Sequence, residues 1–270
     1  METIGIVGIG NMGSVIFRSL LDIFDRHNLY IAEKNPEHLN AVKEENSFFP
    51  QENCVANANA ILGKVDVVIL AMKPQFFQKF YSSLKVDLSS KLIISIMAGV
   101  SLQTLTKNLK SKKVVRCMPN LCVRVKKGLI GWMASKEVTD DEKRFVKKIF
   151  ESMGEQIEVS EESKIDAITA LSGTGPAYFF YLCELLEEKA WDLGFDVEDA
   201  KKLAETTFFG SALTLNKSNL DAKSWRKAVT SKAGTTEAAL KYLEENKFKE
   251  VFKEAVGKAR DRSEELGGFN

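Results

Sequence analysis

The sequence predicts an α/β fold: a Rossmann-type domain with a mainly parallel sheet, followed by an all-helical domain. Two observations carry this prediction. Over residues 3–159 short β-branched runs alternate with stretches of helical period, as in βαβ units around a parallel sheet. After Ser163 only helical periods remain. We therefore expect domains over residues 1–160 and 161–270.

The elements of the first domain are short periodic runs separated by turn residues. Strands are expected over residues 3–7, 29–32, 65–72, 92–97, 114–118, 129–134 and 157–159. Helices are expected over residues 12–24, 76–84, 102–109 and 140–153, with Ser101 and Thr139 as capping residues.

The second domain is expected to hold helices over residues 165–171, 177–193, 197–215, 235–245 and 248–266. The helix that starts at Ala177 carries apolar residues around too much of its surface for a helix with one wet side. It is either central to its own domain or part of a dimer interface.

Composition excludes several classes of partner. The 270 residues include 38 basic and 37 acidic side chains, so neither nucleic acid nor an anionic membrane is an expected partner. The four cysteines have no metal-ligand spacing and most lie in apolar stretches, which predicts core positions and no metal. With no leader pattern and no run of 18 apolar residues, we expect a cytoplasmic protein that acts on a small molecule.

A glycine-rich turn follows the first expected strand. Gly8, Gly10 and Gly13 form a complete GxGxxG that also spans Asn11 and Met12 and opens an amphipathic helix. The first glycine permits the tight turn, the second admits the pyrophosphate, and the third lets helix and strand pack closely. We therefore expect a nicotinamide dinucleotide over this turn, the alternative being a connection without a ligand.

The residues after the second strand leave the choice of dinucleotide open. Glu33, twenty residues after Gly13, can accept hydrogen bonds from a free ribose 2′-hydroxyl, or it is simply a solvated acid. Lys34 beside it can instead hold a 2′-phosphate.

Three further loops lie at carboxyl ends of expected strands, where Rossmann sheets bind ligands. One contains Ala71, Lys73 and Pro74, the next contains Ala98, and the third contains Asn120. We expect these residues near the nicotinamide; the alternative for the proline-containing loops is an ordinary strand-ending turn.

The residues that could move protons narrow the chemistry. The only histidines, His27 and His38, are both expected at the adenosine end of the Rossmann domain, away from any substrate. A hydroxy-acid dehydrogenase needs a positioned acid or base for its alkoxide. A protonated imine needs only correct placement and a hydrogen-bond partner for its nitrogen.

Two segments of the helical half have unusual turn chemistry. Over residues 229–237 hydroxyl and small residues precede a helix, so free N–H groups of Gly234, Thr235 and Thr236 could bind a carboxylate; the alternative is a plain helix cap. Residues 171–178 contain glycines that suggest close backbone approach, in packing, a subunit contact or a substrate wall.

Together these segments resemble the pyrroline-5-carboxylate reductases, which make proline by reducing the cyclic imine 1-pyrroline-5-carboxylate. The resemblance runs the length of the chain: residues 8–12, Lys73-Pro74-Gln75, Met118-Pro119-Asn120, residues 170–178 and, most specifically, residues 229–240.

The resemblance implies hydride transfer from the nicotinamide C4 to the imine carbon C5, with NADPH, or NADH, as cofactor. It implies Thr236 as the catalytic residue facing the ring nitrogen, and Ser231, Gly234, Thr235 and Thr236 as the carboxylate site. The cofactor would be held by Gly8, Gly10, Asn11, Met12, Gly13, Glu33, Lys34, Ala71, Lys73, Pro74, Ala98 and Asn120. The helical domain would form an intertwined homodimer, or a decamer of such dimers, in which each site takes the loop of the partner.

One departure concerns the substrate loop. Where the family usually has Ser-Pro-Gly-Gly, this chain has Ser231-Lys232-Ala233-Gly234. Positive φ at Ala233 would cost on the order of 1 kcal/mol, so we expect an ordinary backbone there. Lys232 either attracts the carboxylate or is solvated.

Two rival interpretations remain. The β-hydroxyacid dehydrogenases share this architecture but would place a catalytic lysine on the helix after Gly173, where the chain reads Tyr-Phe-Phe-Tyr-Leu-Cys. A regulatory protein that binds dinucleotide without turnover would fit the first domain but leaves residues 231–236 unexplained.

Overall fold

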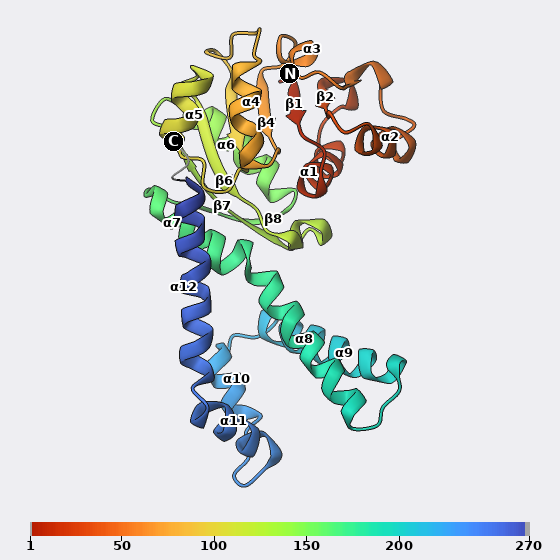
Figure 1. Ribbon diagram of the computed structural model, residues 1–270, viewed down its shortest axis with the longest axis vertical. Coiled ribbons are helices and arrows are strands. Elements are labelled where there is room, and N and C mark those ends of the chain that lie inside the picture. The colour runs from red at the N-terminus through yellow and green to blue at the C-terminus, as the bar shows by residue number, and fades with distance from the viewer. Residues whose placement is uncertain (1, 268–270) are drawn as a thin grey trace. The chain divides into compact units, whose positions relative to one another are not determined.

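The computed structural model describes residues 2–267 and divides into two compact units (Figure 1). The first unit runs to Thr174 and takes up the chain again from Ala259, and the second is Gly175–Lys258. Each unit is a part of the chain whose backbone packs mainly against itself. The predicted division into functional domains at residue 160 stays a prediction.

The first unit is built on an eight-stranded sheet of order β3-β2-β1-β4-β5-β6-β7-β8. All neighbouring strands are parallel except β6 and β7. The strands are β1 Ile4–Val7, β2 Leu29–Ala32, β3 Cys54–Val55, β4 Val67–Leu70, β5 Leu92–Ser95, β6 Val114–Met118, β7 Gly128–Ala134 and β8 Gly154–Glu158. The chain order reverses between β1 and β4, and in parallel sheets a dinucleotide binds at the carboxyl ends beside such a point.

Helices cover both faces of this sheet. Apolar side chains of α1, α2 and α6 form one buried cluster with the sheet, and those of α3, α4 and α5 form a second cluster on its other face. The bounds are α1 Asn11–Leu21, α2 Pro36–Glu45, α3 Asn59–Leu62, α4 Phe77–Ser82, α5 Leu102–Leu109 and α6 Asp140–Glu151. The Rossmann-type fold class is therefore confirmed.

The capping predictions are confirmed in atomic detail. The Ser101 hydroxyl accepts the Thr104 N–H, and Thr139 with Glu142 forms a reciprocal capping box at α6. The sequence missed β3, α2 and α3. β3 has only two residues and α3 four, too few to show a period.

The rest of the first unit is helical. Helix α7 covers Glu162–Ile168 and continues as a π-helix, Thr169–Gly173. The end of α12, from Ala259, returns to this unit, where the hydroxyl of Ser263 donates to Asp166 at 2.9 Å. Asp166 and Glu162 both pair with the buried Arg116 of β6, at 2.7 and 2.8 Å. This ionic cluster ties α7 and the chain's last turns to the sheet.

The second unit consists of α8 Gly175–Asp192, α9 Val197–Asn216, α10 Ala222–Ala228, α11 Thr235–Glu245 and the first part of α12 Phe248–Gly267. Helices α8 and α9 pack along each other. The side chains of α8 stay open, however, with Phe180 61% and Leu186 49% exposed. Of the two predicted roles for this helix, a central place in its own unit is wrong. Within the described range, none of the helices combines the length and apolar character needed to cross a bilayer.

Candidate functional site

The turn from β1 into α1 has the geometry that a dinucleotide needs. Gly8 has a φ of +99°, and a Cβ there would lie 2.9 Å from the backbone of Ala71. A Cβ at Gly13 would lie 2.1 Å from the carbonyl oxygen of Gly8. Both positions therefore require glycine for reasons of packing within the protein.

Gly10 is glycine for a different reason. Among residues 2–267, apart from the neighbours of Gly10 along the chain, no atom would lie within 4 Å of a Cβ at this position, so protein packing does not demand a glycine there. Gly10 is also the N-cap of α1, and no described side chain caps that helix. The uncapped N–H groups at Asn11, Met12 and Gly13 and the open space over Gly10 together fit a bound pyrophosphate.

A cavity of about 470 Å³ opens beside this turn, at the carboxyl ends of the strands. Six of the predicted cofactor residues line it: Gly8, Gly10, Glu33, Lys34, Ala71 and Lys73. The structure adds Asn35, Phe76 and Lys79, which the sequence analysis missed, and His38, which it expected at the adenosine end but did not assign to the cofactor. Phe76 is 55% exposed, and an exposed ring on a cavity is a signal that the structure gives and the sequence does not.

The Glu33 carboxylate stabilises the glycine turn by accepting backbone hydrogen bonds. One carboxylate oxygen accepts the N–H of Ile9 at 2.6 Å and the other accepts the N–H of Asn35 at 2.8 Å. The alternative of a merely solvated acid is therefore wrong. Lys34 and His38 are exposed and line the same cavity without an ion pair in the described chain.

The remaining predicted cofactor residues lie at the same edge of the sheet, outside the lining of this cavity. Pro74 starts a short 3₁₀ turn after β4, and Ala98 is half-buried in the loop after β5. Asn120, after β6, is 9% exposed; its amide donates to Ser172 at 2.9 Å and accepts the N–H of Leu129 at 3.2 Å. Asn120 thus fastens the π-helix to the loop between β6 and β7.

The glycines of residues 171–178 serve at least packing. A Cβ at Gly173 would lie 2.9 Å from the Cε of Met118, so the π-helix passes close to the end of β6. This contact lies wholly within the first unit. Of the three roles left open for this glycine, packing is the one that the contact supports.

The cysteines supply no nucleophile to this region, and of the two histidines only His38 lines the cavity. His27 lies before β2, at the opposite edge of the sheet from the dinucleotide turn, so its predicted place at the adenosine end is wrong, whereas His38 lines the cavity. Cys54 and Cys117 are buried, as predicted, while Cys122 and Cys183 are half-exposed. Burial raises the pKa of Cys54 to about 11 and that of Cys117 further still, so both stay protonated thiols.

The second candidate site is the start of α11. The N–H of Gly234 donates to the carbonyl of Ser231 at 3.1 Å and is not free, contrary to the prediction. The N–H and hydroxyl groups of Thr235 and Thr236, in the first turn, have no hydrogen-bond partner in the described residues. Two N–H groups at a helix N-terminus therefore remain for an anion.

Ala233 has the backbone that the sequence analysis argued against. Its φ is +58°, in the left-handed region, which costs a residue with a Cβ about 1 kcal/mol. The prediction of an ordinary φ is wrong because Glu237 compensates: its Oε2 accepts the N–H of Ala233 at 2.6 Å. Hydrogen bonds to charged groups contribute about 1.5–3 kcal/mol, and even part of that offsets the strain.

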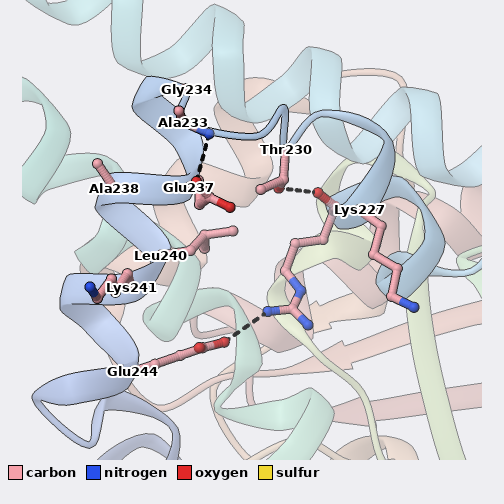
Figure 2. A pocket seen from close by; sticks show the side chains of 10 residues that line it. Lys227, Thr230, Ala233, Gly234, Glu237, Ala238, Leu240, Lys241 and Glu244 are labelled. Atoms are coloured by element: carbon pink, nitrogen blue, oxygen red, sulfur yellow. Dashed lines mark hydrogen bonds and ion pairs between the residues drawn. The ribbon is translucent and has the colours of Figure 1, made fainter.

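This loop borders an open cavity of about 700 Å³ between α10 and α11 (Figure 2). Its walls carry both signs of charge, and Arg226 pairs with Glu244 at 3.4 Å across it. Figure 2 shows Ala233, Gly234 and Glu237 together at one end of the cavity. Nowhere in the described chain do histidine, cysteine and acidic side chains cluster as metal ligands.

Two family models match the chain. Residues 162–266 match one described as pyrroline-5-carboxylate reductase dimerisation, and this stretch includes the whole helical unit. Residues 3–99 match one described as NADP oxidoreductase coenzyme F420-dependent, and this stretch includes the glycine turn.

Individual relatives match almost from end to end. Pyrroline-5-carboxylate reductase 2 of Bacillus subtilis is 32% identical over 270 residues, which cover 98% of this chain and 95% of that protein. A solved pyrroline-5-carboxylate reductase of Coxiella burnetii is 34% identical, covers 98% of both chains and superposes with a TM-score of 0.85. The pyrroline carboxylate reductase of Plasmodium falciparum, solved with NADP bound, is 29% identical, covers 99% of this chain and 98% of that one, and has a TM-score of 0.86.

Proposed function

The chain belongs to the pyrroline-5-carboxylate reductase family, and we propose the residues with which it carries out that family's reaction. It is an oxidoreductase that reduces the cyclic imine 1-pyrroline-5-carboxylate to L-proline, the last step of proline biosynthesis, with NAD(P)H. The observation that carries the assignment of residues is the pair of uncapped helix starts, α1 at the glycine turn and α11 at Thr235.

The first of these holds the cofactor. Gly8 and Gly13 keep the turn tight, Gly10 leaves room for the pyrophosphate, and the N–H groups of Asn11 and Met12 face its charge. Ala71, Lys73, Pro74, Ala98 and Asn120 complete the binding site toward the nicotinamide at the same edge of the sheet. When bound, the reduced nicotinamide supplies the hydride that adds to the imine carbon.

NADPH is the preferred dinucleotide in this proposal. Both oxygens of Glu33 already accept backbone N–H groups, which leaves this carboxylate poorly placed to compete for a ribose hydroxyl. Lys34 and His38 line the cavity next to it and offer cationic or donor groups to a 2′-phosphate. NADH, lacking that phosphate, would bind through the remaining contacts.

The second helix start holds the substrate. The N–H groups of Thr235 and Thr236 bind the carboxylate, with Ser231 and Gly234 shaping the loop in front of them. The hydroxyl oxygen of Thr236 accepts a hydrogen bond from the protonated ring nitrogen and so orients the imine. Since the nitrogen arrives protonated, the residues need only position it and exclude water.

Self-association is shown by the dimerisation domain, and the substrate is a small molecule. The finer proposals are a homodimer, or a decamer of such dimers, whose sites are completed by a second copy, in the cytoplasm and without nucleic-acid or membrane partners. The exposed apolar side chains of α8 and α9 support the dimer.

The direct test is oxidation of NADPH and NADH by the purified protein with and without 1-pyrroline-5-carboxylate. We expect turnover only with the imine present, and inactivity with both cofactors would refute the proposal. Thr236→Ala should lower kcat/KM for the imine about 10- to 100-fold with little change in the KM of NADPH, because one positioned hydrogen bond is lost. Thr106→Ala, the same truncation in α5, is the matched control.

A further inference from the structure

The loop before α11 contains a backbone conformation that its own residue disfavours. Ser231 to Gly234 form a four-residue turn closed by the Gly234 N–H on the Ser231 carbonyl, and Ala233 takes the third position with a φ of +58°. That position of such turns is ordinarily filled by glycine or asparagine. An alanine stays there only when its surroundings hold it.

A residue of the following helix stabilises the positive φ of Ala233. Glu237 is the third residue of α11, and its carboxylate turns back to accept the Ala233 N–H at 2.6 Å. At α6 the acid in the same helical position, Glu142, accepts the N–H of the N-cap residue Thr139 at 2.9 Å. At α11 the N-cap N–H is already bonded within the turn, and Glu237 reaches one residue further back (Figure 2).

The other end of the loop is held separately. The hydroxyl of Thr230 donates to the carbonyl of Arg226 at 2.6 Å and fixes the exit from α10. Between Thr230 and α11 the described structure records only two hydrogen bonds that fix the loop. The Gly234 N–H donates to the Ser231 carbonyl, and the Ala233 N–H donates to the Glu237 carboxylate. Loss of the second would let Ala233 relax to negative φ and carry Ser231 away from the start of the helix.

We propose that Glu237 is a positioning residue for substrate binding: its bond to the Ala233 N–H holds the Ser231–Gly234 turn in the conformation that leaves the Thr235 and Thr236 N–H groups open to the substrate carboxylate. The inference rests on the proposed function of this loop. It also makes Glu237 and Ala233 energetically coupled, because the carboxylate is needed only as long as the residue at 233 resists positive φ.

The test is a double-mutant cycle with Glu237→Ala and Ala233→Gly. Glu237→Ala alone should raise the KM for 1-pyrroline-5-carboxylate about tenfold, because a charge-assisted bond that orders the loop is lost. In the Ala233→Gly background the same truncation should raise it less than about threefold, because glycine adopts the turn without help. Glu237→Gln keeps an acceptor oxygen and should fall between wild type and Glu237→Ala.

Three readouts separate positioning from a general structural effect. The KM of NADPH, the sedimentation coefficient and the melting temperature should stay near the wild-type values in every variant. Glu245→Ala, which removes another carboxylate of α11 far from the loop, is the matched control and should behave as wild type.

An unchanged imine KM in Glu237→Ala would overturn the proposal, as would an equal rise in both backgrounds or a rise accompanied by loss of the dimer. These outcomes are interpreted only when the wild-type enzyme turns over 1-pyrroline-5-carboxylate. Inactivity of the wild type with the imine and both cofactors would instead refute the proposed function, and this inference with it.

Discussion

The two units of the chain bury their apolar side chains to very different extents. In the first unit the side chains of all the central strands are enclosed between two layers of helices. In the described part of the second unit, the only buried residues with apolar side chains besides Pro176 are Ala190, Ala200 and Ala204. Large side chains there, including Phe209 at 69% and Phe180 at 61%, remain exposed.

The two units therefore depend on different contacts for their stability. The Rossmann unit has its own core, so variants in it should change cofactor binding or local stability and leave assembly intact. The helical unit cannot enclose its apolar surface alone, and a surface of this kind marks a protein interface. Its match to a dimerisation domain shows self-association, and we expect a second copy of this chain to cover this surface.

The largest effect should come from charging the helical surface. Phe209→Glu places a carboxylate on the surface that we expect the dimer to bury, and we expect dissociation to monomers at micromolar concentration. Activity should fall by about 100-fold or more, because burying an unpaired charge costs several kcal/mol. Sedimentation velocity and turnover measure the two effects.

Phe48→Glu is the matched control in the Rossmann unit, where Phe48 is 56% exposed. It should leave both assembly and turnover near wild type. A Phe209→Glu protein that remains a dimer with full activity would contradict the expectation that the helical unit, and not the Rossmann unit, carries the dimer contact.

A second prediction concerns the glycine turn of the Rossmann unit. Gly13→Ala forces a Cβ to within 2.1 Å of the Gly8 carbonyl, so the turn must open. We expect the KM of NADPH to rise about 30- to 100-fold, by roughly 2–3 kcal/mol, with the dimer retained. Gly63→Ala is the control, since its φ is −73° and no described atom lies within 4 Å of the added Cβ. Dissociation of the Gly13→Ala dimer would contradict the independence of the two units.

The fold could be predicted where local signals and burial agree. The bounds of β2, β6, α5 and α11 match the prediction to the residue: the two strands are mostly apolar runs, Ser101 caps α5, and α11 begins directly after the loop that ends at Gly234. Helix α10 was missed although Asp221 caps it, since its seven residues are too few to show a period. Strand β8 starts three residues earlier than predicted because its first residues are polar and pair along β7 without being buried.

The candidate sites likewise contain features that could be predicted from the sequence and features that could not. The glycine turn was predictable because each glycine answers a local steric demand that the spacing encodes. The φ of Ala233 was not, because the strain is local while the bond from Glu237 that offsets it depends on where the helix places that side chain. The lining by Phe76 and Lys79 likewise depends on how α4 and the turn before it pack against the sheet.

A third prediction sharpens the role of the Rossmann unit in choosing its cofactor. Lys34→Ala should raise the KM of NADPH about tenfold, the loss of one charged contact to phosphate, and should leave the KM of NADH unchanged. Steady-state kinetics with both dinucleotides measure this. Lys136→Ala, an exposed lysine in the turn after β7, serves as the control. An equal rise for both dinucleotides would show that Lys34 does not contact the 2′-phosphate.

The smallest effect concerns an ionisable contact that belongs to the Rossmann unit alone. The Asp66 carboxylate accepts the N–H and the hydroxyl of Thr3, both at 2.9 Å, and so joins the segments that lead into β1 and β4. The Thr3 N–H bond holds the pKa of Asp66 below its ordinary value of 3.8. A carboxyl with a lowered pKa stabilises the fold in full above its unfolded pKa, and this contribution is lost as pH falls through the lower folded value.

Asp66→Asn should therefore lower the melting temperature by a few degrees at most at pH 7, because the carboxylate is largely exposed and screened by solvent. The difference from wild type should shrink as the pH drops below 3.8 and both proteins carry a neutral group. Thermal melts at several pH values and two protein concentrations test this. A deficit that depends on concentration would place the effect in the dimer, whereas one that is independent of concentration places it in the self-contained core of the Rossmann unit.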